Sequence, residues 1–141
     1  MKRRSPLLLL LALVLIGLSA CGSESVNEAY TAAGDGTHPN ELNRTSTFLT
    51  DDDLNVVITL GSHNRTLPVR AEFIAPDGSR FATDPLDADP TVGEIVLGLD
   101  WEAQGTTTWP TGEWQVEVYV EDERTEQLTF QVQAAAPPAE G

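Results

Sequence analysis

Two groups of carboxylates are the candidate metal ligands of this sequence. The first is the aspartate run at 51–53, and the second holds Asp84, Asp87 and Asp89. Hard cations such as calcium prefer oxygen ligands on irregular backbone, which suits both groups. They could share an ion if they lie at the same end of the fold. The spacing lacks the glycine and the closing glutamate of an EF-hand loop, so solvated turn residues are the alternative reading of both groups.

A pair of tryptophans could serve a second kind of chemistry, the binding of a sugar or a peptide. Trp101 and Trp109 flank a loop that carries Gln104 and the threonines 106–108. Indole faces beside polar groups suit such ligands. The alternative is that Trp109 plugs one end of the core, just before the last two strands of the chain. The sequence favours the plug for Trp109 and leaves both interpretations open for Trp101.

Catalytic motifs do not occur in the sequence. His38 and His63 each stand apart from any second cluster of ligand-type residues. There is no Gly-x-Ser-x-Gly, Ser-x-x-Lys or His-Glu-x-x-His pattern. We therefore expect that the protein is not an enzyme and that it needs no cofactor, calcium being the one open case.

The single thiol stands at the end of an export signal. Basic residues at 2–4 precede an apolar run over 7–18, which is too short for a comfortable membrane span of roughly 20 residues. The sequence Leu-Ser-Ala-Cys follows at 18–21 and resembles the lipobox of bacterial lipoproteins. The resemblance implies cleavage before Cys21 and attachment of diacylglycerol to its sulfur, so that acyl chains hold the protein on a membrane of the cell envelope. Gly22 in place of aspartate implies the outer membrane if the host has two membranes.

Charge narrows the range of partners. The chain has 8 basic and 22 acidic residues. Cleavage before Cys21 removes three of the basic ones, which leaves 5 against 22 and a net charge of −17. Phosphate backbones and anionic headgroups would be repelled, so we expect no nucleic-acid partner and no electrostatic grip on lipid.

Strand periodicity dominates the middle of the sequence. Apolar and polar residues alternate with a period of two in five segments, and no window shows a convincing helical period. The five segments are 54–60, 67–73, 95–99, 114–120 and 128–132, and weaker strands are expected at 45–49 and 80–83. Pro76-Asp77-Gly78 and residues 121–124 predict tight hairpin turns. The pattern predicts an all-β fold, a single immunoglobulin-like or fibronectin-like sandwich of about seven antiparallel strands.

The last two predicted strands support this fold through a resemblance. Trp109-Pro110-Thr111-Gly112 leads into alternating valines up to Val120, and a polar turn precedes Phe130-Gln131-Val132. This order resembles the closing hairpin of bacterial Ig-like extracellular domains, and it implies a fold but no activity. Two marks of antibody domains are missing, namely the disulfide between the sheets and a tryptophan on the third strand.

The domain organisation follows from these patterns. We expect a signal peptide over residues 1–20, a lipidated flexible tether over 21–43, the sandwich over 44–133 and a disordered tail over 134–141. The expected function is that of a non-catalytic envelope lipoprotein whose Ig-like module binds or spaces a protein or glycan partner. The alternatives are a calcium-dependent carbohydrate-binding or adhesion domain, and an accessory subunit of an envelope complex whose edge strands pair with a partner chain.

Overall fold

The computed structural model describes residues 25–100 and 108–135. The export signal, Cys21, Trp101 and the end of the predicted tail lie outside these residues. Within them the chain forms strands and a single short 3-10 turn, η1 (Pro39–Glu41). None of the helices in this part of the chain is long and apolar enough to cross a membrane. The prediction of an all-β fold is confirmed.

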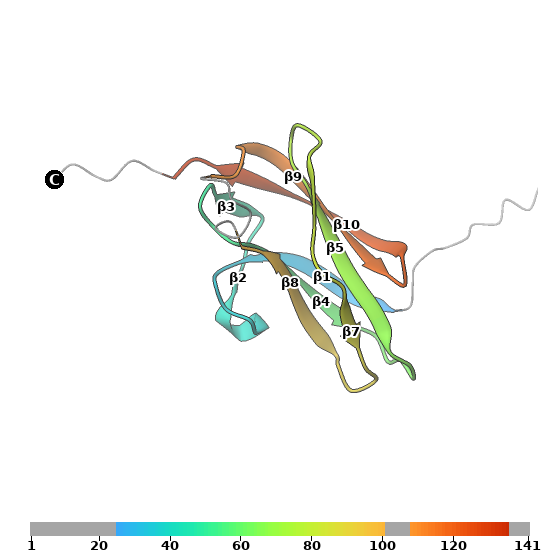
Figure 1. Ribbon diagram of the computed structural model, residues 1–141. Coiled ribbons are helices and arrows are strands. Elements are labelled where there is room, and N and C mark those ends of the chain that lie inside the picture. The colour runs from blue at the N-terminus through green and yellow to red at the C-terminus, as the bar shows by residue number, and fades with distance from the viewer. Residues whose placement is uncertain (1–24, 101–107, 136–141) are drawn as a thin grey trace, which may run out of the picture.

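Two sheets stack face to face, and Figure 1 shows them as two layers. The smaller sheet has the order β2-β1-β4-β8, formed by β2 (Asn43–Arg44), β1 (Val26–Ala33), β4 (Leu54–Leu60) and β8 (Glu94–Leu99). The larger sheet has the order β3-β10-β9-β5-β6, and β7 also pairs with β5. Its strands are β3 (Thr47–Leu49), β10 (Glu123–Gln133), β9 (Gly112–Val120), β5 (Leu67–Ile74), β6 (Arg80–Ala82) and β7 (Leu86–Ala88).

The order of the long strands is that of an immunoglobulin-like sandwich. The first, second and fifth strands of such a domain share one sheet, and the third, sixth and seventh share the other. Here β1, β4 and β8 lie in the smaller sheet, and β5, β9 and β10 lie in the larger one. The long strands pair antiparallel, while the short β3 runs parallel to β10. The predicted Ig-like sandwich is therefore confirmed, with short strands added at the sheet edges.

The core lies between the two layers and follows the alternation in the sequence. On β4 and β9 the inward positions hold leucine, valine, isoleucine and tryptophan, and all are buried. Aromatic rings meet at one end of this core. Trp114 stacks on Phe130 at 5.9 Å between ring centroids, and Phe48 meets Phe130 edge-on at 5.0 Å. Such ring pairs add roughly 0.5–1.5 kcal/mol to the gain from burial alone.

The predicted hairpin turns are confirmed at both places. Between β5 and β6, the N–H of Gly78 donates to the carbonyl oxygen of Ala75 at 2.9 Å. Gly78 has a φ of +89°, which suits a residue without a side chain. Between β9 and β10, Glu121 and Asp122 have φ values of 53° and 64°. A two-residue turn with positive φ at both positions matches the twist of the strands it joins.

The prediction of a flexible tether over 21–43 is wrong for residues 25–43, the part of it that the structure describes. These residues form β1, η1 and the start of β2, and β1 lies inside its sheet between β2 and β4. The strand is not apparent from the sequence, because its buried positions include the small residues Thr31 and Ala32 instead of large apolar ones. A register shift between Val26 and Glu28 also breaks the alternation. The folded unit therefore begins by residue 25 and not at residue 44.

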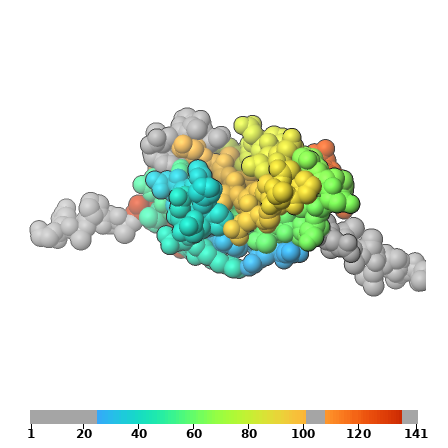
Figure 2. Space-filling view, turned by 90° about the horizontal axis from the view of Figure 1, so that it is seen from below, coloured from blue at the N-terminus to red at the C-terminus, as the bar shows by residue number. Residues whose placement is uncertain are grey.

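The segment after β1 folds back over the smaller sheet. η1 lies against β8, and Figure 2 shows this segment in cyan beside β8 in gold. The side-chain amide of Asn55 on β4 donates to the carbonyl oxygen of Gly34 at 2.9 Å, which ties the segment down. The predicted strand over 45–49 is shorter than expected, because the chain crosses from one sheet to the other at residues 45–46.

Candidate functional site

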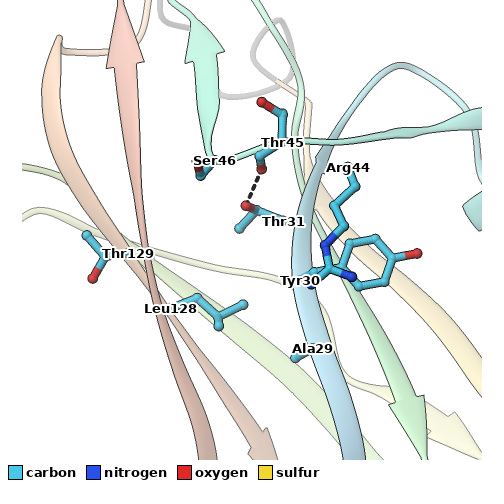
Figure 3. A pocket seen from close by; sticks show the side chains of 8 residues that line it. All are labelled: Ala29, Tyr30, Thr31, Arg44, Thr45, Ser46, Leu128 and Thr129. Carbon is cyan, nitrogen blue, oxygen red and sulfur yellow. Dashed lines mark hydrogen bonds between the residues drawn. The ribbon is translucent and has the colours of Figure 1, made fainter.

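A groove opens along the side of the sandwich, where β1 of one sheet faces β10 of the other. It encloses about 520 Å³. Figure 3 shows the residues that line it, which come from β1, from β10 and from the segment that crosses between the sheets. The lining residues are Ala29, Tyr30, Thr31, Arg44, Thr45, Ser46, Leu128 and Thr129.

Small inward side chains on β1 cause the groove. Ala29 and Thr31 pair with Ile58 and Val56 of β4, whose side chains fill the core, so both point between the layers. Leu128 of β10 packs against the edge of the same core from the opposite sheet. A methyl group and a hydroxyl-bearing stub cannot fill the roughly 10 Å that separate stacked sheets. The space between the sheets is therefore left open along this side.

Hydrogen bonds fix the upper end of the groove. The hydroxyl of Thr31 donates to the carbonyl oxygen of Thr45, and the N–H of Thr45 donates to the carbonyl oxygen of Thr31 at 3.0 Å. Figure 3 shows the first of these bonds as a dashed line. They hold the crossing segment against β1, so this end of the groove has a defined shape.

An aromatic ring and a guanidinium form the outer lip. The guanidinium carbon of Arg44 lies 4.5 Å from the ring centroid of Tyr30. Its Nη1 atom also lies 2.8 Å from the Oε1 atom of Glu28. Because Arg44 and Glu28 are exposed, their ion pair contributes at most about 1 kcal/mol. Tyr30 is partly exposed, so the stacked pair remains accessible to a partner.

Both walls of the groove end in unpaired backbone. β2 pairs with β1 only at Ala32 and Ala33. β3 pairs with β10 only at residues 131–133. In the earlier residues of β1 and of β10, before these short pairings, no described strand pairs with the outer edge of either strand. Hydroxyls, one aromatic ring, one cation and free peptide groups suit the binding of an extended chain. None of the eight lining residues is a histidine, cysteine, aspartate or glutamate.

The groove is not apparent from the sequence, where the β1 region has the composition of a tether. Tyr30 was visible there as a large aromatic residue in a polar stretch. Only the position of β1 beside β10 shows what the ring is near.

Trp109 is buried and does not face a ligand. Only 1% of its surface is exposed, and its indole Nε1–H donates to the carbonyl oxygen of Asp52 at 2.7 Å. The ring meets Trp114 and Phe81 edge-on, with 5.7 Å between centroids in each pair. This is the environment that the core-plug interpretation expects, and it leaves no indole face for a sugar.

Residues 51–53 and Asp89 lie at opposite ends of the sandwich. Residues 51–53 precede β4, whereas Asp89 contacts His63, which follows β4. Seven residues of strand span roughly 20 Å, so residues 51–53 and Asp89 cannot share an ion. The carboxylate of Asp89 accepts from the N–H of Thr91 at 2.8 Å, and the Thr91 hydroxyl is the first cause of its lowered pKa.

The three aspartates 84, 87 and 89 are not gathered around a point. Asp87 lies on β7 opposite Pro68 of β5, Asp84 precedes β7, and Asp89 follows it in a turn. Over residues 25–100 and 108–135, no group of three or more histidines, cysteines, aspartates or glutamates is placed to hold a metal ion.

His63 bridges two loops. Its Nδ1 atom lies 2.9 Å from the carbonyl oxygen of Gly61, and its Nε2 atom lies 2.8 Å from that of Asp89. Both neighbours are acceptors, so only the doubly protonated ring can donate to both. The bond to Gly61 is the first cause of the raised pKa of His63.

A charged cluster on the outer face of the larger sheet was also missed. Glu117 is only 4% exposed. Its two carboxylate oxygens accept from Arg80 at 3.0 Å and from Arg124 at 2.7 Å. The bond from Arg124 is the first cause of the lowered pKa of Glu117, and Arg80 adds to it. On the same face, the guanidinium of Arg70 lies 4.1 Å from the ring centroid of Tyr119. The polar positions of β9 were visible in the sequence, but their partners on β6 and β10 were not.

Comparisons with known proteins bear on the fold. No protein-family model matches the chain, and no curated protein matches it. An alkylpurine DNA glycosylase from Pseudomonas fluorescens, solved with DNA containing an abasic site analogue, superposes with a TM-score of 0.51 and 15% identity. That match covers 78% of this chain, which spans only 30% of the glycosylase's length. An immunoglobulin-like protein from Pseudomonas aeruginosa superposes with a TM-score of 0.49 and 16% identity, over 77% of this chain and 94% of that one. At such identities, structural likeness extends to the fold alone.

Proposed function

We propose that this chain is a non-catalytic lipoprotein of the bacterial cell envelope that binds a protein partner through the groove between β1 and β10. The lipobox-like sequence before Cys21 supports the lipid anchor. The groove supports the binding role, because it joins an accessible Tyr30–Arg44 pair to two unpaired strand edges. Tyrosine and arginine are among the residues that dominate binding energy at protein interfaces.

A protein partner is favoured over a glycan and over a calcium-dependent ligand. Trp109 is buried, and Trp101 lies outside the described residues. Asp89 accepts local hydrogen bonds and Asp87 lies on the short strand β7, so the aspartates at 84, 87 and 89 do not converge. Free peptide groups beside the groove are the chemistry that another polypeptide satisfies best.

The anchor would hold the domain close to the lipid surface. Five residue steps separate Cys21 from Val26, the first residue of β1. A fully extended chain of that length reaches about 18 Å at most. The groove runs along the side of the sandwich, so a partner at the membrane surface could reach it.

Partitioning between water and detergent tests the anchor. The expressed parent chain should enter the detergent phase. Each buried methylene group contributes ~0.8 kcal/mol, and two acyl chains bury far more of these groups than a single chain, which binds membranes only marginally. Cys21→Ser should leave the signal uncut or cut elsewhere and should abolish acylation. A parent chain found in the aqueous phase contradicts the lipoprotein assignment.

Photo-crosslinking in the native host tests the groove. Benzoylphenylalanine in place of Tyr30 is a modest change, because both side chains are aromatic. We expect a crosslinked protein adduct at position 30 and none at the control position 77, an exposed turn residue on a different edge. Equal adducts at both positions, or none at either, argue against the groove as the binding site.

A further inference from the structure

The outer edge of β10 carries peptide groups that nothing in the described chain uses. The N–H of Gln131 donates to the carbonyl oxygen of Ser46 at 2.8 Å, and the carbonyl oxygen of Gln133 accepts from Thr50 at 3.1 Å. Both contacts lie on the side away from β9. Successive residues of a strand point their peptide groups to opposite edges. The pairing of β10 with β9 keeps one register from Glu126 to Val132, so Thr129 and Gln127 point the same way as Gln131.

The crossing between the sheets leaves this edge open. β3 runs parallel to β10 and begins at Thr47, opposite Gln131. Arg44, three residues earlier, pairs with Ala32 of the opposite sheet. The chain therefore joins the edge of β10 only at the level of Gln131 and does not pair with Thr129 or Gln127. Two donors and two acceptors, those of Gln127 and Thr129, remain beside the groove. Unpaired edges of this kind are ready templates for another strand.

We infer that a segment of a partner protein binds here as an added strand on β10, in continuation of β3. The inference rests on the proposed function and specifies how the partner binds. Neighbouring strands lie about 4.8 Å apart, so an added strand would lie over the open space between β10 and β1. Alternate side chains of that strand would point inward, toward Ala29, Thr31 and Leu128. The 520 Å³ groove accepts small apolar side chains at those positions.

Charge specifies the flanks of the bound segment. Glu123 and Glu126 lie on the open part of β10, and neither takes part in an ion pair within the described chain. The two arginines nearby are already paired, Arg124 with Glu117 and Arg44 with Glu28. The occupant is therefore an extended segment with small apolar residues at alternate positions and lysine or arginine beside them. The net charge of −17 expected after cleavage opposes a second copy of this chain at the same edge.

Two synthetic heptapeptides serve as probes. Both have the same alternating threonine–valine middle, and they carry either lysine or glutamate at each end. The full chain is purified in detergent micelles, and binding and hydrogen–deuterium exchange are measured with each peptide. We expect the lysine peptide to bind roughly tenfold or more tightly than the glutamate peptide. We also expect it to slow exchange within residues 126–130.

Substitutions at one position separate the backbone from the side chain. Thr129→Pro removes the outward N–H, and proline is tolerated where that group faces solvent at a sheet edge. Thr129→Val removes the same hydroxyl but keeps the N–H. Only the backbone of Thr129 faces the groove, because its side chain lies with Gln115 and Gln127 on the outer face of the sheet. We expect the proline variant to bind the lysine peptide roughly tenfold more weakly than the parent, and the valine variant to bind it like the parent. Equal melting of the two free variants shows that the fold survives, and Gln127→Pro repeats the test if it does not.

The outcomes distinguish this inference from the proposed function. Equal binding by both Thr129 variants, or lysine-peptide binding without protection of residues 126–130, overturns strand addition. Crosslinking at position 30 that persists in Thr129→Pro would keep the groove as a binding site while refuting this mode. If the lysine peptide adds to β10 but no partner is crosslinked at position 30 in the host, strand addition stands and the proposed function is refuted.

Discussion

Asn55 and Gly98 face each other across β4 and β8, and the amide of Asn55 occupies the place that a side chain at position 98 would need. A Cβ atom at residue 98 would lie 2.2 Å from the Oδ1 atom of Asn55 and 3.0 Å from the carbonyl oxygen of Leu54. The other end of the same amide holds the segment after β1 through Gly34. The glycine therefore makes room for the bond that fastens this segment to the sheet.

Gly98→Ala should destabilise the fold by about 1–3 kcal/mol, the usual cost of overpacking a filled site. Urea unfolding measures the change. Gly93→Ala is the matched control, because a Cβ at that glycine meets nothing within 4 Å. A Gly98 variant as stable as the Gly93 variant would show that Asn55 moves aside at no cost.

Trp109→Ala should lower stability by roughly 3–5 kcal/mol, as large core truncations do. The change removes the ring contacts with Trp114 and Phe81 and leaves the carbonyl oxygen of Asp52 without its indole donor. For a domain of this size, the melting temperature should fall by well over ten degrees. Leu86→Ala is the control, since that leucine is 37% exposed, and it should melt close to the parent. Similar melting of both variants would contradict the core plug.

The long strands could be predicted from sequence because their inward positions hold large apolar residues. β9 alternates Trp114, Val116, Val118 and Val120, and the period of two is plain. β1 could not be found in this way, because its buried positions hold alanine and threonine, and the large apolar residues lie on the neighbouring strand β4. The role of Trp109 could be inferred from its place before the final hairpin.

The groove could not be predicted, because it depends on contacts between distant parts of the chain. Tyr30 and Arg44 come together only when β2 pairs with β1, and Leu128 reaches them only through the stacking of the sheets. The separation of the acidic groups is also invisible in sequence. Residues 51–53 and Asp89 become far apart only because β4 runs the length of the sandwich between them.

His63 should make stability depend on pH in one direction. Its folded pKa is raised, first by the bond to Gly61, so its contribution is complete below the ordinary value of 6.5. That contribution is lost as the pH rises through the raised folded pKa. The melting temperature of the parent should exceed that of His63→Gln most at about pH 5.5 and least at about pH 8.5.

Asp89→Asn is the control for the His63 experiment. It keeps the backbone carbonyl that faces the ring and removes the nearby carboxylate charge, which also raises the pKa of His63. The difference between parent and His63→Gln should therefore shrink in the Asp89→Asn background without vanishing. A difference that grows with pH would contradict the bridging role of the protonated ring.

Glu117→Gln should destabilise the fold by about 2 kcal/mol near neutral pH, because it removes a buried charge that accepts from two guanidinium groups. The pKa of Glu117 is lowered from an ordinary 4.5, first by Arg124. Its stabilising effect is therefore present above that value and is lost as the pH falls through the lower folded pKa. Urea unfolding at several pH values should show the gap between parent and variant closing in acid. Glu113→Gln, on the exposed part of the same strand, should stay within about 0.5 kcal/mol of the parent.

The position of β1 inside its sheet means that the folded domain starts before residue 44. A chain of residues 44–133 lacks β1, so it leaves one whole edge of β4 unpaired and uncovers Val56, Val57 and Ile58. A chain of residues 25–135 keeps both pairings of β4. We expect the longer chain to melt cooperatively with a β-type circular-dichroism spectrum and the shorter chain to show no cooperative transition.

Point changes within β1 separate the effect of the strand from that of chain length. Ala32 has no exposed surface, whereas Asn27 on the same strand is exposed. In the chain of residues 25–135, Ala32→Asp places an unpaired carboxylate in a dry site, which costs several kcal/mol and should abolish cooperative melting. Asn27→Asp adds the same charge in water and should melt like the parent. If both variants and the chain of residues 44–133 melt like the longer parent, then β1 contributes nothing to stability. A dispensable β1 would detach from β4 readily, and the groove that it forms with β10 would lose one of its walls.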